Sequence, residues 1–146
     1  LAMSEEFGAT HKINASKEDV VPRIKELTDR KGVHYAFEAI GLVEKPFVQS
    51  VHCTRYRGIS IWVGHAPLRT PVTIDARDLI MEKTIMASMY GTARPHIEFN
   101  KMLGLYKTGN LKLDELITRR YSLQDINTAF EALAKGEVAR SVLDIG

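Results

Sequence analysis

Three apolar segments of strand character each end in a glycine, and this pattern constrains the fold more than any other feature. The segments read FEAIG, SIWVG and ASMYG, and they end at Gly41, Gly64 and Gly91. Stretches of helical pattern separate them, which predicts a mostly parallel sheet with helices on its faces. The carboxyl ends of parallel strands meet at one edge, where open α/β sheets bind their ligands. For one glycine a simple turn is the commoner explanation. Three in register favour a flat ligand along that edge, because glycine lets a ligand approach the backbone closely.

The chain divides into segments of alternating type. Helices are predicted over 1–7, from Ser16 to about 27, and over 43–54, 77–82, 95–107 and 122–136. Strands are predicted at THKIN, VHYAFEAI, GISIWVG, KTIMASMYG and ARSVLDIG. Ser16 with Asp19, and Ser122 with Asp125, have the spacing of a capping box or a variant of it, which indicates helix starts.

Composition excludes several classes of protein. A chain of 146 residues suits one domain, and its net charge of +2, with the charges interspersed, argues against a nucleic-acid surface. No apolar stretch approaches the roughly 20 residues that a membrane span needs. Cys53 is the only cysteine, and no two histidines form an H-x-x-x-H pair, so the chain offers neither a disulfide nor a recognisable metal site. We therefore expect a cytoplasmic domain without membrane or nucleic-acid partners.

Several segments resemble consecutive landmarks of the zinc-dependent, medium-chain alcohol dehydrogenases. They are FGATHKINA, YAFEAIG, SIWVGHAP, LKLDELITRRYSLQDINTAFEALAKGE and ARSVL. The resemblance covers the chain from end to end and implies an incomplete Rossmann-like fold: residues 1–146 as a single partial NAD-binding domain, the C-terminal part of a longer dehydrogenase. Its first two strands and glycine-rich turn are expected to be absent, because no glycines here have G-x-G-x-x-G spacing.

The resemblance also implies which residues bind the cofactor NAD: Ala39, Ile40, Gly41, Val63, Gly64, His65, Met89, Tyr90 and Arg140. The first three match a strand end near the nicotinamide-side ribose, and the next three match backbone that hydrogen-bonds the carboxamide. Met89 and Tyr90 match the next strand end. Arg140 matches an arginine that pairs with the pyrophosphate, a role that suits a guanidinium fork. From its residue type alone, a solvated surface arginine is the default.

Two neighbouring positions stay outside this set. Leu42 stands where several members of the family carry an arginine, so one cationic contact to the cofactor is missing. Glu38 is a strand-end carboxylate that can hydrogen-bond either nearby backbone or ribose hydroxyls, and both alternatives stay open.

The resemblance implies hydride transfer between an alcohol or aldehyde and nicotinamide, with zinc as the Lewis acid in the parent enzyme. The family's zinc ligands come from the preceding domain, so we expect no catalytic or metal residue here and no activity from the segment alone. The alternative is a standalone nucleotide-binding or scaffolding module without catalysis. A zinc-free quinone reductase relative is a third possibility, which the segment LKLDELITRRYSLQDINTAFE disfavours.

The edges of the predicted sheet lack partners. KTIMASMYG would lie last in the sheet, and an uncovered edge invites pairing with a second chain. We expect a homodimer through residues 62–89, which the resemblance also implies. THKIN loses its usual neighbours, so we expect it to dock beside VHYAFEAI, or a second polypeptide to fill that gap, because unpaired backbone groups there are costly.

Overall fold

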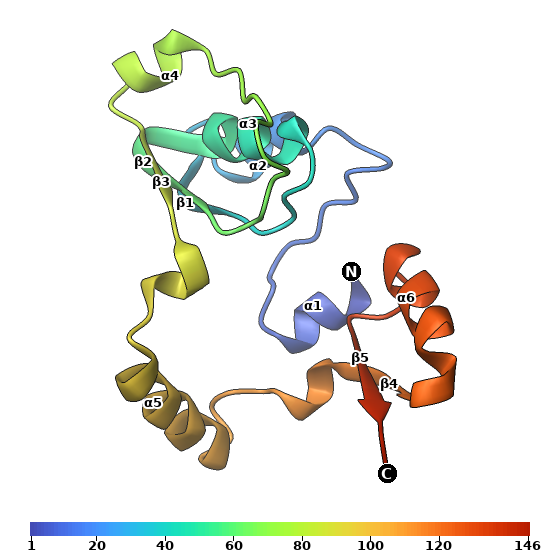
Figure 1. The fold of residues 1–146 in the computed structure, drawn as a ribbon. Helices are drawn as coiled ribbons and strands as arrows, with labels where there is room; N and C mark the ends of the chain where they lie inside the picture. The colour runs from blue at the N-terminus through green and yellow to red at the C-terminus, as the bar shows by residue number, and fades with distance from the viewer. The chain divides into compact units, whose positions relative to one another are not determined.

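The computed structural model describes residues 1–146, which form two compact units, Leu1–Ala93 and Arg94–Gly146. Each unit contains its own parallel sheet (Figure 1). The architecture confirms the predicted class: α/β, with Rossmann-like parallel sheets and flanking helices. None of the helices combines the length and the apolar character needed to cross a membrane.

The sheet of the first unit has three strands in the order β1-β2-β3. They are β1 (Val33–Glu38), β2 (Thr54–Trp62) and β3 (Thr84–Ala87), and both pairings are parallel. Glu38 lies opposite Trp62, and Trp62 lies opposite Ala87, so all three strands end at the same level. This register places the segments that follow the strands at a common edge, as the strand-end glycines predict.

Helix α3 (Glu44–Cys53) covers this sheet and supplies most of its core. It packs against β1 and β2, and α2 (Val20–Leu27) packs against α3 (Figure 1). Phe47 and Val51 are buried, and the Phe47 ring meets Trp62 edge-on with 4.9 Å between ring centroids. Two shorter helices, α1 (Ala2–Glu6) and α4 (Ala76–Ile80), complete the helices of this unit.

The second unit pairs β4 (Ile117–Ser122) with β5 (Arg140–Asp144), again in parallel. Its helices are α5 (Pro95–Lys107) and α6 (Ile126–Ala134). Ala129 and Ala132 of α6 are buried together with Val138. The structure confirms the predicted bounds of α5, which begins at a proline suited to the first helical turn, but β4 has no counterpart among the predicted strands.

The prediction that THKIN forms a strand beside VHYAFEAI is wrong. Residues 10–14 form no strand, and the free edge of β1 is not paired with this segment. The alternative, that a second polypeptide fills the gap beside β1, stays a prediction. A strand is stable only when a neighbour satisfies its backbone groups. The structure provides no such neighbour for this segment.

One predicted helix start is also wrong in detail. Helix α2 begins at Val20 after Asp19, not at Ser16, whose amide and hydroxyl donate to Asn14 Oδ1 at 3.0 and 2.7 Å. Asn14 thus closes a local turn that competes with the helix. The last helix begins where predicted, because Ser122 flanks a 3-10 turn, Leu123–Asp125, that leads directly into α6. The Ser122 hydroxyl donates to Asp125 Oδ2 at 2.6 Å and accepts no backbone amide of the helix.

Candidate functional site

The carboxyl ends of β1 and β2 are tied together by backbone hydrogen bonds. The amides of Val63 and Gly64 both donate to the carbonyl oxygen of Glu38, at 2.8 and 2.9 Å. The amide of Leu42 donates to the carbonyl oxygen of His65 at 3.0 Å. The turn after β1 is therefore bound to the turn after β2 at both of its ends, and we call residues 38–42 and 63–65 the strand-end clasp.

Both glycines of the clasp are required by its close packing. Gly41 has a φ of +68°, and a Cβ there would collide with the backbone of His65. A Cβ on Gly64 would collide with Glu38 Oε2 and with the amide nitrogen of Gly41. The two turns meet backbone to backbone, which only glycine at both positions allows.

The side chain of Glu38 stabilises the first turn of the clasp from inside. It is buried, with 3% of the residue exposed, and Oε1 accepts the amides of Ile40 and Gly41, each at 2.8 Å. Its other oxygen, Oε2, is also buried and has no hydrogen-bond partner in the chain. Of the two alternatives for Glu38, the structure shows the bond to nearby backbone.

Six of the nine cofactor-binding residues predicted from the sequence lie in the clasp. Ala39, Ile40 and Gly41 form its first turn, and Val63, Gly64 and His65 form the second. Residues Ile40 and Val63 are 69% and 45% exposed. The clasp thus presents a small apolar surface beside its glycines.

Met89 and Tyr90 lie at the same edge of the sheet, just beyond β3. They begin a 3-10 turn, Met89–Thr92, in which Tyr90 has a φ of 48° and Gly91 one of 71°. The amide of Ser88 donates to the carbonyl of Trp62 at 2.9 Å, which fixes the start of this turn to the end of β2. Both side chains are exposed.

Arg140, the ninth predicted residue, lies in the second unit. It is exposed at the start of β5, where its carbonyl accepts the hydroxyl of Thr118 at 3.1 Å. Its guanidinium takes part in no ion pair within the chain. The role of Arg140 toward a cofactor stays a prediction.

Sequence reasoning missed one member of the clasp. The sequence marks Leu42 only by the arginine that it replaces, yet its amide closes the clasp and its φ of 67° is left-handed. No local signal marks such a residue, because its partner His65 is set by the pairing of β1 with β2.

The clasp leaves several backbone groups free for a ligand. None of the hydrogen bonds in the structure uses the carbonyl oxygens of Ile40, Val63 and Gly64 or the amide of His65. A planar primary carboxamide carries two N–H donors and one acceptor oxygen. The free carbonyls can accept from the N–H donors of a carboxamide, and the free amide can donate to its oxygen. The nearby glycines let such a ligand approach the backbone closely.

The chain's own side chains do not fit a zinc ion. No group of three or more His, Cys, Asp or Glu residues is placed to hold a metal. Cys53, the only thiol, is buried at the C-terminal end of α3, and this burial raises its pKa despite the opposing charges of Lys25 and Lys83. A neutral, buried thiol is a poor metal ligand and a poor nucleophile.

Comparison with known proteins gives consistent matches along the chain. A family model described as zinc-binding dehydrogenase matches residues 1–108. The NDMA-dependent alcohol dehydrogenase of Amycolatopsis methanolica is 30% identical over 141 residues, which cover 94% of this chain and 38% of that enzyme. The chain therefore spans well under half the length of this relative.

Solved structures give the same result. The crystal structure of benzyl alcohol dehydrogenase from Acinetobacter calcoaceticus matches with a TM-score of 0.91 and 31% identity, over 100% of this chain and 40% of that one. A putative zinc-binding dehydrogenase from Sinorhizobium meliloti 1021, solved bound to NADP, matches with a TM-score of 0.76 and 27% identity. That match covers 88% of this chain and 37% of the solved chain.

Proposed function

The chain belongs to the zinc-binding dehydrogenase family, and on that premise we propose that it is the C-terminal cofactor-domain segment of an NAD(P)-dependent alcohol dehydrogenase. The relatives named above include two alcohol dehydrogenases, and each match covers two fifths or less of the relative. The complete enzyme would exchange a hydride between an alcohol or aldehyde and the nicotinamide. In this proposal the segment supplies part of the cofactor site, and residues outside it supply the chemistry.

The strand-end clasp is the observation that carries the proposal. It places free carbonyls and a free amide at the carboxyl edge of a parallel sheet, where dinucleotides bind in open α/β folds. The nicotinamide carboxamide would hydrogen-bond to Val63, Gly64 and His65. Ile40 and Val63 would shield the ring from water, and Met89 and Tyr90 would face it from the next strand end.

Bound nicotinamide supplies the hydride acceptor or donor, and the protein contributes binding and orientation. Glu38 would act at one remove, because its Oε1 fixes the amides of Ile40 and Gly41 and so holds the turn beneath the ribose. Arg140 would pair with the pyrophosphate in the assembled enzyme. The family's zinc would be held by residues outside this segment, since the segment's own side chains do not fit it.

Four further features belong to the same proposal. Residues 1–146 would form part of one NAD-binding domain of the complete enzyme, and that enzyme would be cytoplasmic. Its partners would be a nicotinamide cofactor and a small alcohol or aldehyde, without nucleic acid or membrane. The open edge of β3 would pair with a second copy to form a homodimer.

The test compares the segment with its complete protein. The gene is read upstream of Leu1, and the complete product is assayed for alcohol-dependent NADH or NADPH formation. An in-frame G-x-G-x-x-G, cysteine ligands and measurable turnover would support the proposal. Their absence would favour the standalone nucleotide-binding or scaffolding module.

The isolated segment is tested in parallel by calorimetric titration with NAD and by metal analysis. We expect negligible NAD binding, because no glycine-rich turn is present to hold the pyrophosphate, and no stoichiometric zinc. Binding with a Kd of about 1 μM, corresponding to about −8 kcal/mol, would contradict the idea that the segment holds only the nicotinamide half of the site.

A further inference from the structure

A concave surface lies at the amino edge of the sheet of the first unit, opposite the edge that carries the clasp. It encloses about 510 Å³ between the last turns of α2 and α3, the start of β2, and α4. Its polar lining is mostly basic, with Lys25, Arg30, Lys31, His52, Arg77 and Lys83. We call it the amino-edge pocket.

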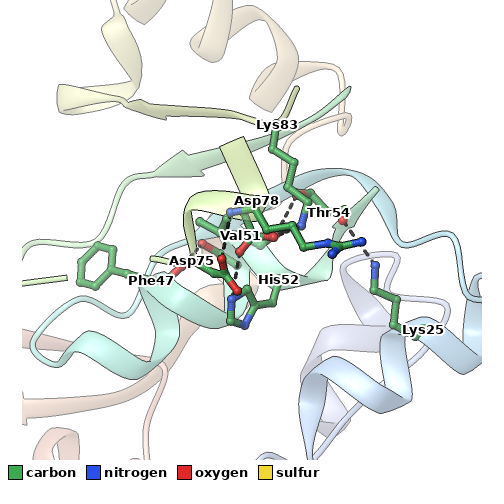
Figure 2. A network of polar contacts seen from close by, with 10 residues as sticks. Lys25, Phe47, Val51, His52, Thr54, Asp75, Asp78 and Lys83 are labelled. Carbon is green, nitrogen blue, oxygen red and sulfur yellow. Dashed lines mark hydrogen bonds and ion pairs between the residues drawn. The ribbon is translucent and has the colours of Figure 1, made fainter. Parts of the chain in front are cut away.

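One carboxylate in the pocket is already engaged. Asp78 Oδ1 accepts Lys83 Nζ at 2.6 Å, and Asp78 Oδ2 lies 3.0 Å from His52 Nε2 (Figure 2). Lys83 is largely buried and also donates to the carbonyl of Val51 at 3.0 Å. These contacts connect α3, α4 and the start of β3 along one side of the pocket.

The only other carboxylate of the pocket is also occupied. Asp75 Oδ1 accepts the amide of Arg77 at 2.8 Å and caps α4. Five cations against two carboxylates leave the pocket lining with a net charge of +3, counting His52 as neutral.

Four cations of the lining therefore have no carboxylate partner: Lys25, Arg30, Lys31 and Arg77. Lys25 Nζ donates to the carbonyl of Thr54 at 3.4 Å (Figure 2) and to that of Lys31 at 3.4 Å, and to no carboxylate. The C-termini of α2 and α3 each offer about half a negative charge, which offsets about one of these cations. The remaining positive charge is not balanced by the two carboxylates of the pocket lining.

We propose that the amino-edge pocket binds a small, multiply charged anion of the phosphate class. Two guanidinium forks and two ammonium groups around one cavity suit phosphate oxygens, which arginine contacts bidentately and lysine as a point charge. The site lies at the other end of the strands from the clasp, so it is independent of the proposed nicotinamide site.

The test follows backbone amide resonances of the full 146-residue chain during titration with inorganic phosphate and then pyrophosphate. Sodium chloride at matched ionic strength serves as the screening control. We expect saturable shifts at Lys31, at Arg77 and at Tyr56, which also lines the pocket, with pyrophosphate binding at a Kd of about 1 mM or tighter. Gly41 and Gly64 should not shift.

Charge variants make the test specific. Lys31→Gln and Arg77→Gln, both at exposed positions, should each weaken pyrophosphate binding about tenfold, on the scale of one hydrogen bond to a charged group. Lys45→Gln makes the same charge change at the start of α3, away from the pocket, and should leave the affinity unchanged.

Three results would overturn the proposal. Non-saturable shifts spread over surface lysines would show general screening. Equal weakening by Lys45→Gln would show an effect of net charge alone. Shifts at Gly41 and Gly64 would place the anion at the clasp.

Discussion

At the scale of single residues, Gly64 is the position where sequence and geometry constrain each other most tightly. A Cβ there would collide with Glu38 Oε2 and the Gly41 amide, so Gly64→Ala must push the two turns apart. We expect the free energy of unfolding to fall by about 1–3 kcal/mol, the usual cost of forcing extra atoms into a packed site. Urea denaturation of the two proteins measures the difference.

Gly104 provides the matched control for that substitution. It lies within α5, where an added Cβ meets no atom within 4 Å. Gly104→Ala should raise stability by about 0.5–1 kcal/mol, because alanine loses less backbone entropy in a helix. If both substitutions cost the same, the clasp is not closely packed.

Cys53 gives a prediction about pH. Burial raises its pKa, so the thiol is neutral at pH 7 and only the small thiolate fraction reacts. We expect iodoacetamide to alkylate the folded chain slowly, at a rate still rising above the ordinary thiol pKa of about 8.5. Mass spectrometry follows the reaction, and the chain in urea is the control. A rate that levels off below about pH 8 would indicate a lowered pKa instead.

The clasp residues could be predicted from the sequence where their role depends on neighbours in the chain. They could not be predicted where the role depends on how β1 pairs with β2. Gly41 and Gly64 could be found because glycine directly after an apolar strand is visible in the sequence. From the sequence, hydrogen bonding of Glu38 to nearby backbone is only one of two alternatives, and nothing indicates the role of the Leu42 amide. Both depend on the register of β1 against β2, which brings His65 beside Leu42.

At the scale of elements, the backbone amides of β1 and β2 should differ sharply in their protection from hydrogen exchange. β2 has a neighbour on both sides, whereas β1 has one only on the side of β2. Hydrogen exchange measured residue by residue should therefore show every second amide of β1 exchanging fast and the amides of β2 protected. Uniform protection along β1 would reveal a partner at its open edge.

Elements that carry a local sequence signal could be predicted, whereas elements that depend on a distant partner strand could not. Helices α3 and α5 carry their own signals, an apolar face in α3 and an initial proline in α5, and both lie where expected. β4 has a polar sequence, ITRRYS, and is a strand only because it pairs with β5 more than twenty residues later. THKIN shows the converse, since strand-like residues form no strand without a neighbour.

At the scale of the whole molecule, the free edge of β3 predicts association. Met86 on this strand is 46% exposed, and Ile80 just before it is 76% exposed. We expect light scattering to show a dimer whose mass depends on concentration, and Met86→Lys to weaken it, because lysine on an edge strand opposes pairing. Leu103→Lys in α5 is the control. A monomer mass at high concentration would count against the dimer.

All strand pairs of the chain are parallel, so none can form as a local hairpin. Tyr35 pairs with Ile59, and Ile59 with Thr84, and each pairing must close a loop of about two dozen residues. Non-local contacts of this kind make folding slower than in helical proteins of similar size. Helix α3 connects β1 to β2 and contacts both, so its docking should form part of the rate-limiting barrier. Val51→Ala, at a fully buried position of α3, should then slow refolding in stopped-flow experiments, whereas faster unfolding with unchanged refolding would place that docking after the barrier.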